Sequence, residues 1–365
     1  MPKVVRFLDL SVDEERRRRY LAAIDRILLT GLILNGPEVE AFEKGVAAYC
    51  GTKSAVGVGS GTAALYLALK CLRIGAGDEV ILPALSFVGT ANAVASLGGR
   101  PVFVDVRHDL LIDPISVEAA ISPRTKAIMP VHFTGNVCEM SSLLAIGERH
   151  AIPIIEDAAQ AFGASFRGRK VGTFGPLGCF SMNPMKVLGA VGEAGIILVQ
   201  SEMFLPRLRD LRYHGLQNRE MCVEVSLNER LDTIQAAILS MRLQEHEDNL
   251  RRRQAIASRY TAQLSDVVEV PRPATGIVHG WYTYTILCDR RDELAKTLQA
   301  AGVECKIYSS RLMPGHAVYA GYEGRFPVGQ GLVEQLLCLP MHEKLTDDEI
   351  DRVAETVAGF YGRAR

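Results

Sequence analysis

Lys186 carries the only charged side chain between Lys170 and Glu193. It stands in the stretch GPLGCFSMNPMKVLGAVGEAG, residues 175–195, which is otherwise apolar, small or neutral up to Glu193. An ammonium group taken out of water loses hydration, so it is costly unless it is paired or used chemically, and its pKa falls. The resulting neutral amine is a nucleophile that forms Schiff bases. The alternative is a surface lysine extending from a glycine-rich loop.

A turn of small residues, GVGSGTAAL at 57–65, is a second candidate for chemistry. A β-branched run leads into it and a helical pattern follows. Its small side chains, Gly61 and Thr62 among them, let an anion approach the backbone, and a helix N-terminus offers free N–H groups and a positive dipole end. A tight strand-to-helix turn without a ligand explains the pattern equally well.

Two further residues follow predicted strands. Asp157 comes after the apolar run IPIIE, where a carboxylate with little solvent needs a cationic or hydrogen-bonding partner. The alternative for Asp157 is a helix N-cap. Phe87, in LPALSFVGTANA, can cover the face of a flat ligand ring or simply pack in the core.

The elements that position these residues are short apolar runs separated by helical patterns. Such continuous runs are typical of strands in a mainly parallel sheet that is covered on both faces. Ligands of these sheets bind beyond the carboxyl ends of the strands. We therefore predict an α/β architecture with seven strands, starting near Ser54, Glu79, Arg100, Lys126, Ala151, Leu177 and Ala194.

The pattern becomes helical from Arg230 to about Leu264, as one long helix or two abutting ones. A mixture of apolar runs and helical patterns follows, and Thr346 with Glu349 fits a capping box at the start of a last helix. We predict a large α/β domain over residues 1–245 and a smaller α+β domain over residues 246–365.

The order of these features along the chain suits one cofactor, pyridoxal 5′-phosphate (PLP). PLP needs an anion cradle, an acid opposite its ring nitrogen and an amine for its aldehyde. The small-residue turn, Asp157 and Lys186 provide the three in that order. Ser181, at the end of a predicted strand, can donate to the same phosphate as Gly61 and Thr62.

On these motifs the sequence resembles the sugar aminotransferases of the DegT/StrS type, within the fold-type-I PLP-dependent transferases. The resemblance covers nearly the whole chain. It is carried by LNGPEVEAFEKGVAAYCGTKSAVGVGSGTAAL, LPALSFVGTANAV, RPVFVDV, IIEDAAQAFGA, CFSMNPMKVLGAVGEAG, LNERLDTIQAAIL and LPMHEKLTDDEIDRV.

The resemblance implies a role for each matching residue. Lys186 would hold the cofactor through its aldehyde and then move protons, while Asp157 would pair with the ring nitrogen. Around them, the resemblance places Gln160 near the ring hydroxyl, Phe87 on the ring face, and Gly61, Thr62 and Ser181 at the phosphate. Asn228, supported by Arg230, would reach the phosphate of the neighbouring subunit, so a homodimer with shared active sites is expected.

The implied reaction moves an amino group from glutamate or glutamine to a keto sugar, which we expect to be nucleotide-linked, in the biosynthesis of an amino sugar for a surface polysaccharide or natural product. A keto-cyclitol or an aldehyde-bearing sugar acid is the alternative acceptor. The related dehydratases carry histidine in place of the lysine, so Lys186 favours transamination. Two segments depart from the family pattern where acceptor contacts are expected, PVHFTGN at 130–136 and YSSRLMPGHAVY at 308–319.

Composition narrows the other possibilities. The net charge of -1 implies no bulk attraction to nucleic acid or to an anionic membrane, and a non-catalytic PLP-binding regulator would lack a basic DNA-binding patch. The eight cysteines have no metal-like spacing, so we expect reduced thiols, no metal and a cytoplasmic protein. No apolar signal segment or membrane span is expected.

Overall fold

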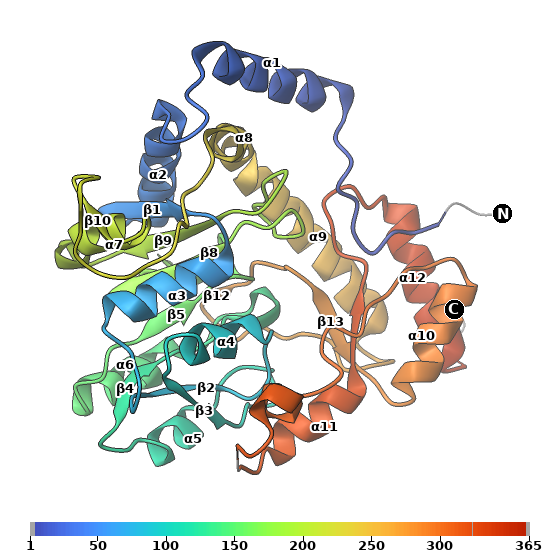
Figure 1. Ribbon diagram of the computed structural model, residues 1–365. Helices are drawn as coiled ribbons and strands as arrows, with labels where there is room; N and C mark the ends of the chain where they lie inside the picture. The colour runs from blue at the N-terminus through green and yellow to red at the C-terminus, as the bar shows by residue number, and fades with distance from the viewer. Residues whose placement is uncertain (1–3, 323, 363–365) are drawn as a thin grey trace.

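The computed structural model describes residues 4–322 and 324–362. Its centre is a sheet built from the seven predicted strands (Figure 1). They are β1 (Ser54–Val58), β2 (Glu79–Pro83), β3 (Arg100–Val104), β4 (Thr125–Ile128), β5 (Ile155–Asp157), β8 (Leu177–Ser181) and β9 (Gly195–Val199). Each of the seven apolar runs that predict a strand contains one, so this prediction is confirmed.

The strands form two hydrogen-bonded groups, ordered β1-β9-β8-β5 and β4-β2-β3. Parallel bridges from Ile128 to Ile154 and from Val131 to Asp157 join β4 to β5, so the seven strands make one surface. Strand β9 is the exception to the parallel arrangement, because it runs antiparallel to both β1 and β8. The expected mainly parallel sheet is therefore present.

Helices cover both faces of this sheet. On one face α3 (Gly61–Cys71) packs against β8 and β9, and on the other α2 (Pro37–Cys50) packs against β1 and α8 (Thr233–Gln244). Alternate strand residues enter two separate apolar clusters, Ile81 on one side and Val80 and Leu82 on the other. Burial on both faces explains why the strands are apolar throughout rather than alternating.

The helical region after Arg230 forms two abutting helices, α8 and α9 (His246–Leu264). Helix α8 begins at Thr233, three residues later than predicted, because Arg230 is held in an extended bridge with Val58. The strands β13 (Tyr284–Leu287) and β14 (Leu336–Leu339) pair beyond α9. The domain boundary at residue 245 stays a prediction.

The C-terminal part has its own apolar cluster, in which α9 packs against α12 (Asp347–Phe360) and α10 (Arg291–Ala300) packs against α12. Thr346 and Glu349 form the predicted capping box of α12. Among the residues that the structure describes, no helix is both long and apolar enough to cross a membrane.

At the other end of the chain, α1 (Glu14–Thr30) contains the arginine run and is capped by Asp13, whose side chain accepts from the Arg16 N–H at 2.8 Å. Arg16 and Arg19 both pair with Glu245. The remaining helices are α4 (Gly89–Ala95), α5 (Pro114–Ala119), α6 (Met140–Arg149), α7 (Leu205–Leu211) and α11 (Pro327–Gln335). The short strands are β6 (Ser165–Phe166), β7 (Arg169–Lys170), β10 (Leu216–Gln217), β11 (Met221–Cys222) and β12 (Ile277–Val278).

Candidate active site

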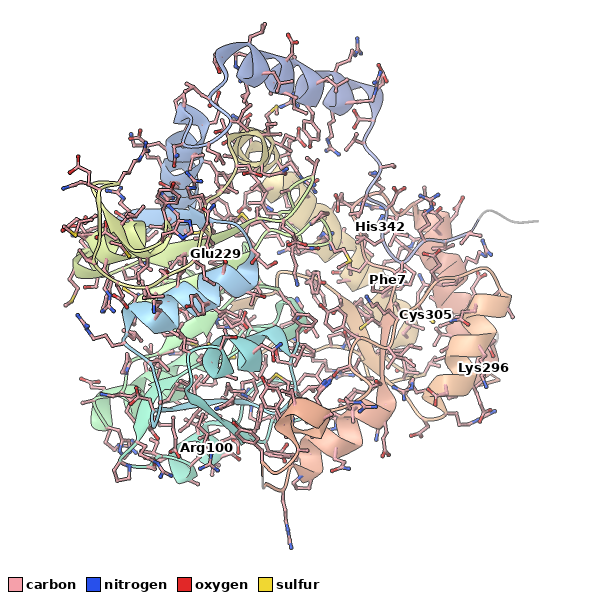
Figure 2. All side chains as sticks on the ribbon, viewed as in Figure 1. Phe7, Arg100, Glu229, Lys296, Cys305 and His342 are labelled. Carbon is pink, nitrogen blue, oxygen red and sulfur yellow. The ribbon has the colours of Figure 1, made fainter. Side chains whose placement is uncertain are left out.

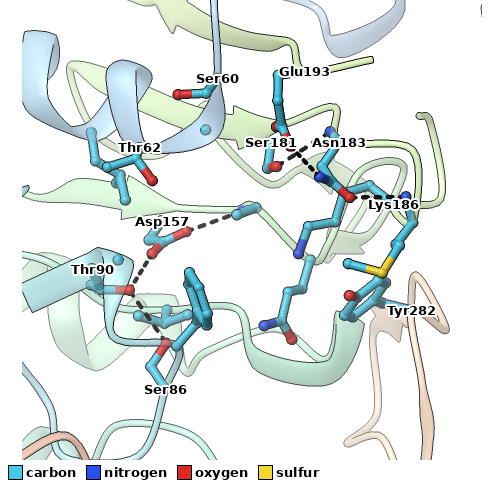
Figure 3. A pocket seen from close by; sticks show the side chains of 18 of the residues that line it. Ser60, Thr62, Ser86, Thr90, Asp157, Ser181, Asn183, Lys186, Glu193 and Tyr282 are labelled. Atoms are coloured by element: carbon cyan, nitrogen blue, oxygen red, sulfur yellow. Dashed lines mark hydrogen bonds between the residues drawn. The ribbon is translucent and has the colours of Figure 1, made fainter. Parts of the chain in front are cut away.

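A cavity of about 360 Å³ lies where β5 and β8 end and α3 begins; we call it the central cavity (Figure 3). Its volume is typical of a site for a small molecule. Seven of the eight residues predicted to surround a cofactor line it, although they are spread over more than a hundred positions of the chain. They are Gly61, Thr62, Phe87, Asp157, Gln160, Ser181 and Lys186.

Lys186 sits in the loop that follows β8, where its backbone N–H donates to the Asn183 carbonyl at 2.8 Å. The side chain points into the central cavity, and its Nζ lies 4.3 Å from the centre of the Tyr282 ring (Figure 3). Burial lowers the pKa of Lys186 to about 8, against the opposing attraction of Asp157 and Glu193. A larger share of this amine is therefore neutral and nucleophilic at physiological pH than for an exposed lysine, the direction that its isolation in the sequence predicted.

Asp157 is buried at the end of β5. One carboxylate oxygen accepts from the Thr90 hydroxyl at 2.7 Å and the other from the Ala159 N–H at 3.1 Å. No α-helix begins directly after Asp157, so this residue is not a helix N-cap. Burial raises the pKa of Asp157, while these hydrogen bonds and the charge of Lys186 lower it. Asp157 makes no ion pair with any described residue, so a protonated ring nitrogen would supply the missing cation.

The small-residue turn is the N-terminus of α3. Ser60 caps the helix by accepting from the Ala63 N–H at 3.0 Å, which leaves the N–H groups of Gly61 and Thr62 without a partner in the described part of the chain. A Cβ on Gly61 would lie 2.5 Å from the Cβ of Ser181, so only glycine fits there. This close approach brings the Ser181 hydroxyl to the same helix end and makes a cradle for an anion.

Phe87 is 60% exposed and lines the central cavity, so it does not pack in the core. An aromatic ring of this exposure is available to stack on a flat ligand. Gln160 is buried, and its side-chain carbonyl accepts from the Thr134 N–H at 2.8 Å. The amide N–H₂ group of Gln160 is left as the donor to a ligand in the cavity.

Asn228 does not line the central cavity of its own chain. It is exposed, and its side-chain oxygen accepts from Arg230 Nε at 3.0 Å. The N-cap of α8 is Asp232, so Asn228 does not cap that helix. Its predicted place at a neighbouring subunit's phosphate is untested by a single chain.

Several residues of the central cavity were not predicted. They include Ser86, Thr90, Asn183, Glu193, Tyr282 and Tyr308. Tyr282 and Tyr308 join their hydroxyls at 3.0 Å, and Asn183 donates to Glu193 at 2.6 Å. Val131 and Tyr308, from the two segments that depart from the family pattern, also line the cavity. The only sequence feature that pointed to Tyr308 was that its segment, residues 308–319, differs from the family pattern.

Comparison with known proteins places this site in a family. The model of the DegT/DnrJ/EryC1/StrS aminotransferase family matches residues 14–358. A protein of Streptomyces venezuelae named dTDP-3-amino-3,4,6-trideoxy-alpha-D-glucose transaminase is 39% identical over 360 residues, which are 97% of this chain and 95% of that protein.

Solved structures agree with this. The crystal structure of S. venezuelae DesV in complex with a ketimine intermediate matches this chain with a TM-score of 0.96 at 38% identity, and both chains are fully covered. That of NtdA from Bacillus subtilis with bound pyridoxamine phosphate (PMP) has a TM-score of 0.91 at 30% identity, and covers 99% of this chain and 86% of NtdA.

These findings confirm the fold, the enzyme class and the cofactor expected from the sequence. The central cavity fits PLP on the geometry of its own residues, because it joins a half-buried amine, a carboxylate that makes no ion pair with a described residue, and a glycine cradle at a helix N-terminus. The chain belongs to the DegT/DnrJ/EryC1/StrS aminotransferase family and is a PLP-dependent sugar aminotransferase.

Proposed function

We propose that this enzyme transfers an amino group from glutamate or glutamine to a keto sugar linked to a nucleotide, within amino-sugar biosynthesis. The observation that carries the proposal is the place of Lys186, a half-buried amine that faces the central cavity opposite Asp157. The similarity to a relative named for a dTDP-linked sugar supports the class of acceptor. A dehydratase is disfavoured because those relatives carry histidine where this chain has Lys186.

When bound, PLP supplies an aldehyde for the amino group and a ring that withdraws electrons. In the proposal, the free N–H groups of Gly61 and Thr62 hold its phosphate, together with the Ser181 hydroxyl. Asp157 keeps a proton on the ring nitrogen, Phe87 covers the ring and Gln160 donates to its hydroxyl. Lys186 would hold the cofactor by its aldehyde, and its neutral amine would take the proton from the donor's α-carbon.

The experiment that tests this function presents the PMP form of the purified enzyme with a panel of keto sugars. Recovery of the absorbance of the lysine-bound cofactor identifies an acceptor. We expect recovery with nucleotide-linked keto sugars and none with simple 2-oxo acids other than the donor's own product. Recovery with a free keto-cyclitol or a sugar-acid aldehyde alone would move the assignment to that acceptor class.

We also propose that the enzyme is a homodimer in which Asn228 completes the neighbouring active site. Asn228 is exposed, and a set of apolar side chains that face solvent precedes it in the chain. A second such set ends at Leu34, which is bridged to Asp232, four residues after Asn228. The two sets are Leu28, Leu29, Leu32, Ile33 and Leu34, and Met221, Val223, Val225 and Leu227. A self-complementary contact would bury both sets.

Subunit mixing tests the shared site. Lys186→Ala and Asn228→Asp should each be poorly active as homodimers. A hybrid dimer has one site with both defects and one site with neither, so random mixing should restore roughly a quarter of wild-type activity. Exchange is verified by mass, and verified hybrids without recovery would mean that Asn228 acts within its own subunit.

All eight cysteines are free, which supports the proposed cytoplasmic location.

A further inference from the structure

Next to the Lys186 loop lies a second, much smaller cavity of about 30 Å³, which we call the N-terminal cavity. Its walls come from the segment before α1, from α1 itself, from the α8–α9 junction and from the loop at Pro184 and Lys186. Lys186 lines both the N-terminal cavity and the central cavity, so the two spaces are adjacent at this residue.

The segment before α1 is fixed in place over this cavity. The carbonyl of Phe7 accepts from the Met341 N–H at 3.4 Å, and the carbonyl of Arg6 lies 3.2 Å from His342 Nε2 (Figure 2). Lys344 reaches across to the Ser11 hydroxyl at 3.1 Å. The wall is therefore built by residues from both ends of the chain.

Cations outnumber carboxylates in this wall. Three of its cations have a carboxylate partner in the same wall: Arg16 pairs with Glu245 at 3.0 Å, Arg253 with Glu343 at 3.0 Å and Lys344 with Asp9 at 3.5 Å. Each of these three charges is thus largely neutralised where it stands.

Apart from Lys186, Arg242 is the cation of this wall that remains. Its guanidinium is half-buried in the wall, yet it makes no ion pair or hydrogen bond with any residue that the structure describes. Arg253 is 3% exposed, and its Nε also lacks a partner within the described ranges. A guanidinium that is partly removed from water without a partner is costly, and a carboxylate is the ligand that its planar donors match best.

We propose that the N-terminal cavity is the carboxylate subsite of the amino donor, with Arg242 as its binding cation. This inference rests on the proposed function, in which the donor is an α-amino acid. A donor whose carboxylate binds Arg242 would have its amine directed toward Lys186, the residue that it must displace. The acceptor sugar would then bind beside the cofactor, in the part of the central cavity that Tyr282 and Tyr308 line.

The test measures the two half-reactions separately. The PLP form is mixed with L-glutamate, L-glutamine or L-alanine, and loss of the lysine-bound cofactor's absorbance gives a half-saturating concentration and a limiting rate. Arg242→Gln should raise the half-saturating donor concentration by about 10- to 100-fold, the effect of losing one charged hydrogen bond, with little change in the limiting rate. Arg242→Lys should lie between Arg242→Gln and wild type.

The choice of donors identifies which carboxylate binds. If Arg242→Gln raises the half-saturating concentration of all three donors, Arg242 binds the α-carboxylate. If only the value for glutamate rises, Arg242 binds the side-chain carboxylate. Both results support the subsite. Saturation of the PMP form by the keto sugar should be unchanged. If Arg242→Gln weakened the keto sugar and not the donors, the cavity would bind the acceptor's phosphate and the proposal would be wrong.

A binding measurement independent of turnover completes the test. Glutarate has two carboxylates and no amine, so it binds without reacting, and its affinity for the PLP-loaded enzyme can be measured by calorimetry. Arg242→Gln should lose this affinity, whereas Arg251→Gln, on the exposed side of α9 beside Asp248, should retain it. Equal affinity in all three proteins would overturn the subsite. Wild type that binds glutarate but reacts with no donor would contradict the proposed function instead.

Discussion

Two carboxylates stand side by side in β5, and the chain uses them differently. Glu156 is fully buried and accepts from the N–H groups of Gly172, Phe174 and Gly175 at 2.6–2.9 Å. His132 Nε2 lies 3.1 Å from it. Asp157 is almost as buried, but among the described residues only the Thr90 hydroxyl and one backbone N–H donate to it, and it lines the central cavity.

His132 supplies a further hydrogen bond to Glu156, as its tautomer shows. The Cys138 N–H donates to His132 Nδ1 at 3.2 Å, so Nδ1 is the acceptor and Nε2 carries the hydrogen that goes to Glu156. Every donor around Glu156 is therefore matched within the protein. Successive strand residues point to opposite faces of the sheet. Glu156 therefore holds buried backbone N–H groups on one face, whereas Asp157 on the other face keeps hydrogen-bonding capacity for a ligand. Burial alone does not distinguish the two carboxylates, whereas unused hydrogen-bonding capacity does.

The largest effect should come from the amine that shares the cavity with Asp157. Lys186→Ala removes the nucleophile and the proton-transfer base together, so turnover should fall by at least about 10⁴-fold. Stability should fall little or rise, because a costly buried ammonium is lost. Borohydride reduction of wild type should fix the cofactor to the peptide that contains Lys186. Label on another lysine would contradict the assignment.

Asp157→Asn keeps the shape of the side chain but cannot hold a proton on a ring nitrogen. We expect kcat to fall by about 10- to 150-fold, the equivalent of roughly 1.5–3 kcal/mol for a charged hydrogen bond. The melting temperature of the protein without cofactor should change little. Near-normal turnover of this variant would make Asp157 a structural carboxylate like its neighbour.

Glu156→Gln should show the opposite pattern. The side-chain amide N–H₂ group would face N–H donors that now point at a carboxylate, so the free energy of unfolding should drop by about 2–3 kcal/mol. Chemical denaturation measures this loss. The kcat of the folded enzyme should remain close to that of wild type, and a loss of kcat larger than that of Asp157→Asn would reverse the comparison.

The smallest effect is expected one step further from the cavity. Thr90→Val removes the hydroxyl that donates to Asp157 and keeps the shape, so kcat/KM should fall by about fivefold, the equivalent of about 1 kcal/mol. The pH dependence of the bound cofactor's absorbance should shift as well, which a packing defect alone would not cause. Thr90→Ser keeps the hydroxyl and serves as the control.

The sequence by itself determined most of the frame. The seven apolar runs identified the seven strands, because burial on both faces of a parallel sheet leaves a local pattern. The isolation of Lys186, the glycine of the α3 turn and the capping box of α12 were equally visible, since each depends on neighbouring residues. The family resemblance then supplied the order in which these pieces meet.

Only the tertiary structure decided what depends on distant contacts. It reversed β9 within the sheet, exposed Phe87 to the cavity and brought Tyr282 and Tyr308 to Lys186. It also gave Glu156 and Asp157 different roles, and it left Arg242 without an ion-pair partner among the residues that the structure describes. Whether a charge is paired depends on side chains far away in the chain, and no local pattern records how those segments pack together.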